Sequence, residues 1–165
     1  MTRNLLAALV PSAAACLLLS ACGSTAPART EIAATPDTGE LALQPLPPFE
    51  IDPKTCTMVL LTRDTSGTRV MAAFDAPAVG RIRVHGTTLN LPRAEVSGAV
   101  RAGQSERQVY RGEDGSVLIS DVRFEDAGDP ASGAMIRSGT VAYTAPNGET
   151  VITPVVGIAT CGAAP

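Results

Sequence analysis

The residues of this chain with side chains reactive near neutral pH are four cysteines and one histidine. Cys16 and Cys22 lie near the N-terminus, and Cys56 and Cys161 lie 105 residues apart in the remainder. Two small residues, Ser20–Ala21, directly precede Cys22. Cys22 thus follows two small residues, whereas Cys56 and Cys161 stand far from it in the sequence.

The segment before Cys22 has the parts of a secretory signal. Met1–Asn4 is polar with one cation, and Leu5–Leu19 is an apolar run of fifteen residues. A membrane span needs about 20 helical residues, whereas the apolar part of a signal has about 7–15. Pro11 within the run also disfavours a stable spanning helix. We therefore expect residues 1–21 to be a signal peptide. The alternatives are a signal whose cleavage site contains Cys by chance, and a buried helix.

The sequence Leu19-Ser20-Ala21-Cys22 resembles the lipobox of bacterial lipoproteins. The resemblance implies a diacylglyceryl group on the Cys22 sulfur, cleavage before Cys22, and acylation of the new amine, typically with palmitate. Two or three acyl chains anchor a protein firmly because each buried CH₂ adds about 0.8 kcal/mol. The residue after Cys22 is Gly23 and not Asp. In lipoproteins of Gram-negative bacteria this implies transport to the outer membrane, so in such a host we expect the anchor there and the domain facing the periplasm. We therefore expect an exported, membrane-anchored protein.

Cys56 and Cys161 remain as an even pair in an oxidising compartment, which predicts a disulfide. A zinc site is the alternative, but two isolated cysteines and His85 cannot supply the four ligands of a structural site. Cys56 begins the first strand-like run and Cys161 ends the last, so the bond would join the two ends of one domain. The chain-entropy model assigns about 4–5 kcal/mol to closing a loop of this size. We expect neither a metal nor another cofactor.

Motifs of catalysis are missing from the sequence, which contains no Gly-x-Ser-x-Gly, Ser-x-x-Lys, P-loop or Gly-x-Gly-x-x-Gly. His85 ends an alternating run and is expected on its solvent face, which is typical of a surface residue. Glu125, Asp126 and Asp129 could hold a calcium ion, but their spacing differs from that of calcium loops, and we favour a solvated acidic loop. We expect a protein that is not an enzyme. An envelope hydrolase with paired carboxylates is an alternative.

Charge is unevenly distributed along the chain. Loss of Arg3 with the signal leaves 12 basic and 16 acidic residues, a net charge of −4 over the 144 residues 22–165. Residues 63–111 contain eight Arg and four acids, and residues 112–165 contain two Arg and seven acids. The basic part lacks interleaved aromatic residues, so we expect solvated strand faces and no nucleic-acid partner. We also expect a monomer.

Residues 22–54, which begin at the lipidated Cys22, are predicted to form a disordered Pro- and Ala-rich tether. Six prolines lie between residues 23 and 54, and such a segment buries too little apolar surface to order itself. As a coil it would span on the order of 30 Å. Leu41–Phe49 is more apolar than a linker needs. It either packs along the domain surface, which we favour, or acts as a docking peptide.

Residues 55–165 are predicted to be a disulfide-closed β domain. Apolar and polar residues alternate in short runs, no segment has helical spacing over three turns, and Ile82 and Val84 share one face. Asn147-Gly148 between two such runs is the strongest hairpin signal. Turns every 8–12 residues favour an all-β fold, a small antiparallel barrel or sandwich of about eight strands. The expected strands are 56–63, 69–74, 80–85, 87–91, 107–111, 117–124, 135–144 and 151–161.

Two short motifs, Ser97-Gly98 and Val109-Tyr110-Arg111-Gly112, lie in the middle of the expected domain. In a small disulfide-closed barrel on a lipid anchor, they resemble motifs of the membrane-bound inhibitors of C-type lysozyme, where Trp-x-Lys-Gly stands in the second position. The resemblance implies that Ser97 and Arg111 reach into the active cleft of lysozyme. The chain departs from the family in having no Trp, in having Arg in place of Lys, and in its longer C-terminal stretch.

The sequence therefore predicts a lipid-anchored cell-envelope lipoprotein with a non-catalytic binding or structural β domain. A lysozyme inhibitor is the first alternative, and an envelope hydrolase is the second. The expected partners are the membrane, through the acyl chains on Cys22, and an envelope protein or lysozyme.

Overall fold

The structure is a computed structural model of the 165-residue chain, and it describes residues 39–125 and 133–162. The expected signal peptide, Cys22, the first part of the expected tether, Asp126 and Asp129 lie outside the described residues. In the part of the chain that is described, no helix has the length and apolarity to cross a membrane.

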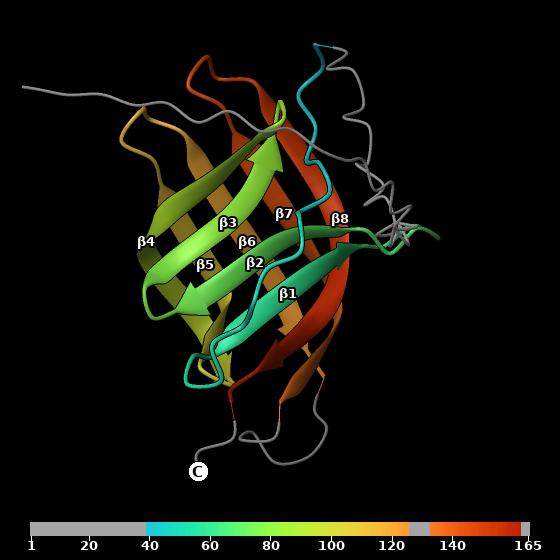
Figure 1. The fold of residues 1–165 in the computed structure, drawn as a ribbon, viewed down its shortest axis with the longest axis vertical. Coiled ribbons are helices and arrows are strands. Elements are labelled where there is room, and N and C mark those ends of the chain that lie inside the picture. Colours follow the sequence, from blue (N-terminus) through green and yellow to red (C-terminus); the bar gives the residue numbers. More distant parts are fainter. Residues whose placement is uncertain (1–38, 126–132, 163–165) are drawn as a thin grey trace, which may run out of the picture. The chain divides into compact units, whose positions relative to one another are not determined.

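Eight antiparallel strands form a closed barrel (Figure 1). Each strand pairs with the next one along the chain, and β8 returns to pair with β1. This confirms the all-β expectation and selects a barrel over a sandwich. The strands are β1 (Thr57–Thr62), β2 (Arg69–Asp75), β3 (Ala78–Val84), β4 (Thr87–Arg101), β5 (Gln104–Arg111), β6 (Val117–Phe124), β7 (Ala134–Thr144) and β8 (Thr150–Thr160).

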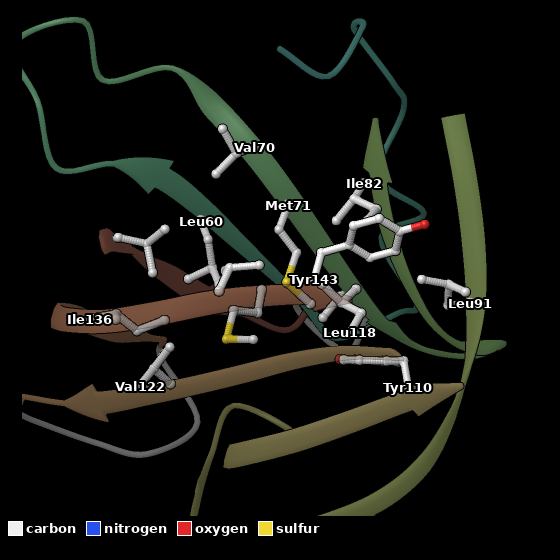
Figure 2. Packing of buried hydrophobic residues seen from close by; sticks show 14 of the residues in the cluster. Leu60, Val70, Met71, Ile82, Leu91, Tyr110, Leu118, Val122, Ile136 and Tyr143 are labelled. Carbon is white, nitrogen blue, oxygen red and sulfur yellow. The ribbon is translucent and has the colours of Figure 1, made fainter. Parts of the chain in front are cut away.

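The core lies inside the barrel because alternate residues of each strand point inward. Leu60, Met71, Ile82, Tyr110 and Leu118 are fully buried and belong to one apolar cluster. Figure 2 shows these side chains converging from different strands. An eight-stranded barrel is about wide enough for side chains to fill it, and in this barrel they form a packed core.

The wall differs from the sequence expectation most clearly around β4. β4 continues to Arg101 instead of ending at Leu91, and β5 begins at Gln104 instead of Arg107. His85 was expected to end a strand and instead occupies the turn between β3 and β4. Its φ is 46° and that of Gly86 is 75°, the conformation of a two-residue hairpin turn. The turn therefore comes one residue earlier than the alternating pattern implied.

The last part of the expected tether, residues 39–54, lies along the barrel and is called the strap here. The pairing between β2 and β3 begins at Met71 opposite Ile82, so it does not reach the carbonyls of Arg69 and Arg83. The backbone N–H of Leu46 donates to Arg69 O (2.9 Å), and that of Gln44 donates to Arg83 O (2.8 Å). The strap, cyan in Figure 1, thus supplies the pairing that β2 and β3 do not give each other.

Side chains of the strap also pack against the barrel. Leu41 is buried in the core cluster, and Leu43 packs against that cluster. Phe49 meets Phe74 edge to face at 5.6 Å, and the guanidinium of Arg69 lies 4.8 Å from the Phe49 ring centroid. This is the surface packing favoured for Leu41–Phe49, and the packed domain therefore includes residues before 55.

Candidate functional site

The second half of β4 pairs with β5 alone. The β3–β4 pairing ends at Val79 opposite Pro92, and no described strand pairs with the other edge of residues 93–101. We call residues 93–111 the β4–β5 ribbon. Residues 94–100 of this ribbon are all exposed, whereas a strand within the barrel wall would bury every second side chain. Seven consecutive residues are therefore accessible to a partner.

Two bulges shape the exposed edge of the ribbon. The register of β4 against β5 shifts between Arg93 and Glu95 and again between Ser97 and Val100. Gly98, inside the second bulge, has a φ of 84°. Bulges bend an edge strand and hinder edge-to-edge pairing with another chain. The ribbon therefore presents side chains to a partner rather than a straight edge for strand addition.

Ser97 and Arg111 both lie on the ribbon, although the structure does not bring them together. Ser97 is exposed and lies opposite Arg107, while Arg111 is four residues further along β5. The Arg111 Nη2 donates to Glu95 Oε1 at 3.0 Å. Ser97 is exposed within a strand, and the basic residue opposite it in the register is Arg107.

Ion pairs join β4, β5 and β6 to one another. The basic stretch 63–111 and the acidic stretch 112–165 meet there, because Arg107 of β5 pairs with Asp121 of β6. All of the arginines in these pairs are well exposed, so each pair contributes at most about 1 kcal/mol. The pairs are Arg107–Asp121 (3.1 Å), Arg111–Glu95 (3.0 Å) and Arg123–Glu106 (3.2 Å).

The inner face of the ribbon is held by a chain of polar hydrogen bonds. Gln108 Oε1 accepts from Tyr110 OH at 2.9 Å and from Arg93 Nη1 at 3.1 Å. Gln108 Nε2 donates to Gln104 Oε1 (2.9 Å), and Gln104 Nε2 donates to Cys56 O (3.1 Å). Both glutamines are fully buried. The network therefore ties β5 to the start of β1.

Sequence reasoning missed this network because the expected strand began at Arg107 and left out Gln104. Gln104, Gln108 and Tyr110 are separated by even numbers of residues, so they share one strand face if β5 starts before Arg107. That spacing is the sequence signal that could have revealed the network.

Tyr110 is the large polar aromatic of the interior. Burial raises the pKa of its phenol well above the ordinary value, although the positive charge of Arg93 opposes the shift. The phenol therefore stays protonated and keeps donating to Gln108.

The expected disulfide between Cys56 and Cys161 is present, and the β4–β5 turn rests on it. Gly103 in that turn has a φ of 69°, and a Cβ there would lie 2.7 Å from Cys56 Sγ. Ala102 beside it is buried. The turn can approach the disulfide this closely only because residue 103 lacks a side chain.

Acidic side chains that could serve in catalysis or bind a metal do not form a cluster in the described residues. Glu113 and Asp114 line a shallow hollow beside Leu89–Pro92. The Ser116 hydroxyl and backbone N–H donate to Asp114 Oδ1 and lower the pKa of that carboxyl. Within residues 39–125 and 133–162, no three His, Cys, Asp or Glu side chains gather as metal binding requires.

The fold and the site define an eight-stranded up-and-down β-barrel, closed by a disulfide, with an exposed ribbon on one side. No protein-family model, no curated protein and no solved structure matches this chain.

We predict that Gly103→Ala destabilises the protein more than Gly148→Ala. Gly148 also has a positive φ, but a Cβ there would meet nothing within 4 Å, so it reports backbone strain alone. We expect a loss of about 1–2 kcal/mol for Gly148→Ala and about 1–3 kcal/mol more for Gly103→Ala, by overpacking against the disulfide. Urea unfolding of both variants measures the difference, and equal losses would contradict the packing described for the turn.

A second prediction concerns alkaline pH. The folded-state pKa of Tyr110 is raised above the unfolded value of about 10, so its stabilising contribution is complete below that pH and declines above it. Tyr110→Phe should lose about 1 kcal/mol near neutral pH, with the Gln108 hydrogen bond, and show a weaker alkaline decline. Unfolding free energies measured from pH about 8 to about 11 test this. An unchanged slope in the variant would contradict it.

Proposed function

We propose that this chain is a lipid-anchored lipoprotein of the bacterial cell envelope, and that its barrel is a non-catalytic binding domain. The contact surface of that domain is the β4–β5 ribbon, and its partner is another envelope protein. In a Gram-negative host the anchor lies in the outer membrane and the barrel faces the periplasm.

The anchor is supported by the order of features at the N-terminus. A cation, an apolar run, a Leu, two small residues and Cys22 follow one another as lipidation requires. The disulfide between Cys56 and Cys161 supports export, because such bonds persist in oxidising compartments.

The observation that carries the binding role is the run of seven exposed residues on a rigidly held ribbon. Val96 and Val100 are 55% and 57% exposed. Arg101 and Arg107 lie near them, and interfaces favour such a mixture of apolar groups and arginine. Because the buried network and the disulfide already fix the ribbon, a partner would order little on binding it.

The anchor is tested by Cys22→Ala in cells fed with labelled palmitate. We expect the wild-type protein to carry label and to sediment with membranes, and the variant to lose both because it lacks the thiol. Cys16→Ala is the matched control, since it removes a cysteine from the same N-terminal segment and leaves both Cys22 and the disulfide intact. A Cys22→Ala protein that stays labelled and membrane-bound would contradict the anchor.

The ribbon is tested by site-specific photocrosslinking in intact cells. A photoreactive amino acid in place of Ser97 should give one discrete adduct with another envelope protein. The same group in place of Thr88, an exposed β4 residue within the β3–β4 pairing, is the control. Adducts of equal yield and identity at both positions, or none at position 97, would contradict the assignment of the ribbon.

Inhibition of lysozyme is the second candidate function, favoured by the exposed Ser97 and by its register partner Arg107, whose guanidinium pairs with Asp121. The full-length protein should then inhibit a C-type lysozyme, and Ser97→Asp should abolish inhibition because a carboxylate would repel the acidic catalytic groups. Absence of inhibition at protein concentrations of tens of micromolar would remove this candidate and leave the general binding role.

A further inference from the structure

The outer face of β8 is apolar over four successive outward positions. Val155, Gly157 and Ala159 are buried and point into the barrel, so the residues between and before them point out. These outward residues are Ile152, Pro154, Val156 and Ile158.

The neighbouring strands extend this surface. Val59 of β1 and Met135 of β7 lie on either side of Ile158 in the register of the sheet. We call Val59, Met135, Ile152, Pro154, Val156 and Ile158 the β8 face. Ile152 is 63%, Met135 55% and Ile158 46% exposed.

The β8 face differs from the opposite side of the barrel in charge. Its six side chains carry no charge, and the ion pair of Arg137 with Glu125 lies at its border on β7, whereas three ion pairs join β4, β5 and β6 to one another. β4 is four strands away from β8 around the eight-stranded barrel, and Figure 1 shows the two on opposite sides. The ion pairs of β4 to β6 therefore lie on the side of the barrel away from the β8 face.

The size of the β8 face decides between two occupants. Three strands about 4.8 Å apart and seven residues of about 3.3 Å each give an area on the order of 300 Å². A stable complex between two proteins buries about 800 Å² on each partner. The face is therefore too small to hold a second copy of the chain by itself. Contact with a bilayer surface needs less buried area, because the acyl chains already supply most of the attachment.

We propose that the β8 face lies against the lipid bilayer that carries the anchor, so that the β4–β5 ribbon points away from the membrane. The inference rests on the proposed lipidation of Cys22. Sixteen residues separate Cys22 from Gly39, so this connection cannot exceed about 60 Å in any conformation. The barrel is thus held beside the bilayer at a high effective concentration.

The exposed Arg63 lies beside the β8 face, next to Pro154. The backbone N–H of the exposed Arg63 donates to Pro154 O at 3.1 Å. The neighbouring carboxylate of Asp64 accepts hydrogen bonds from the hydroxyls of Thr62 and Ser66. An apolar face with arginine at its rim is the arrangement that suits a membrane interface.

The test uses the absence of Trp from the natural chain. Ile152→Trp places a single indole on the β8 face, and Val96→Trp places one at a comparably exposed aliphatic position of the ribbon. Each full-length, lipidated variant is reconstituted into phosphatidylcholine–phosphatidylglycerol vesicles with and without brominated acyl chains. Ile158→Trp repeats the test at a second position of the face, in case the first variant folds poorly.

We expect brominated lipid to lower the emission of the β8-face indoles at least twofold and to leave the ribbon indole unchanged. Vesicle-bound protein with no quenching, or with equal quenching at both sites, would overturn the orientation while leaving the anchor intact. Protection of the β8-face indole from both brominated lipid and aqueous iodide would indicate a protein occupant and also overturn it. Failure of the protein to sediment with vesicles would overturn the anchor and this inference together.

Discussion

The disulfide between Cys56 and Cys161 is the constraint on which the rest of the structure depends. It joins the start of β1 to the end of β8, two points 105 residues apart, at the position where the barrel must close. The turn between β4 and β5, in the middle of the domain, rests on the same bond because Gly103 has no side chain. The buried Gln104 then binds the Cys56 carbonyl, so that three distant parts of the chain meet at one end of the barrel.

Closure of the barrel explains where a partner can bind. In a closed barrel the backbone N–H and C=O groups at the edges of each strand are paired with a neighbouring strand. Where β2 and β3 diverge, the strap supplies the backbone hydrogen bonds that these strands do not form with each other. The stretch of β4 beyond Pro92 is different, since it pairs with β5 alone and is exposed over residues 94–100. The same junction that closes the barrel holds this ribbon in place from its inner side.

The sequence predicted the wall of the barrel well because alternation of apolar and polar residues follows directly from inward and outward orientation. Ile82 and Val84 point inward as expected, and Asn147-Gly148 forms the hairpin turn between β7 and β8. The exposed half of β4 could not be predicted in this way, since a strand without a buried face has no alternation. The strap was hard to place because its bonds to Arg69 and Arg83 depend on where β2 and β3 separate.

The central claim is that the disulfide junction fixes the β4–β5 ribbon as a preformed contact surface. Amide hydrogen exchange of the full-length protein, oxidised and then reduced, measures this most directly. The account predicts strong protection of β5 in the oxidised protein. Reduction should speed exchange first in the ribbon and at the joined ends of β1 and β8, while the β6–β7 pairing stays protected. Loss of protection that is uniform over the barrel, or a ribbon unaffected by reduction, would contradict it.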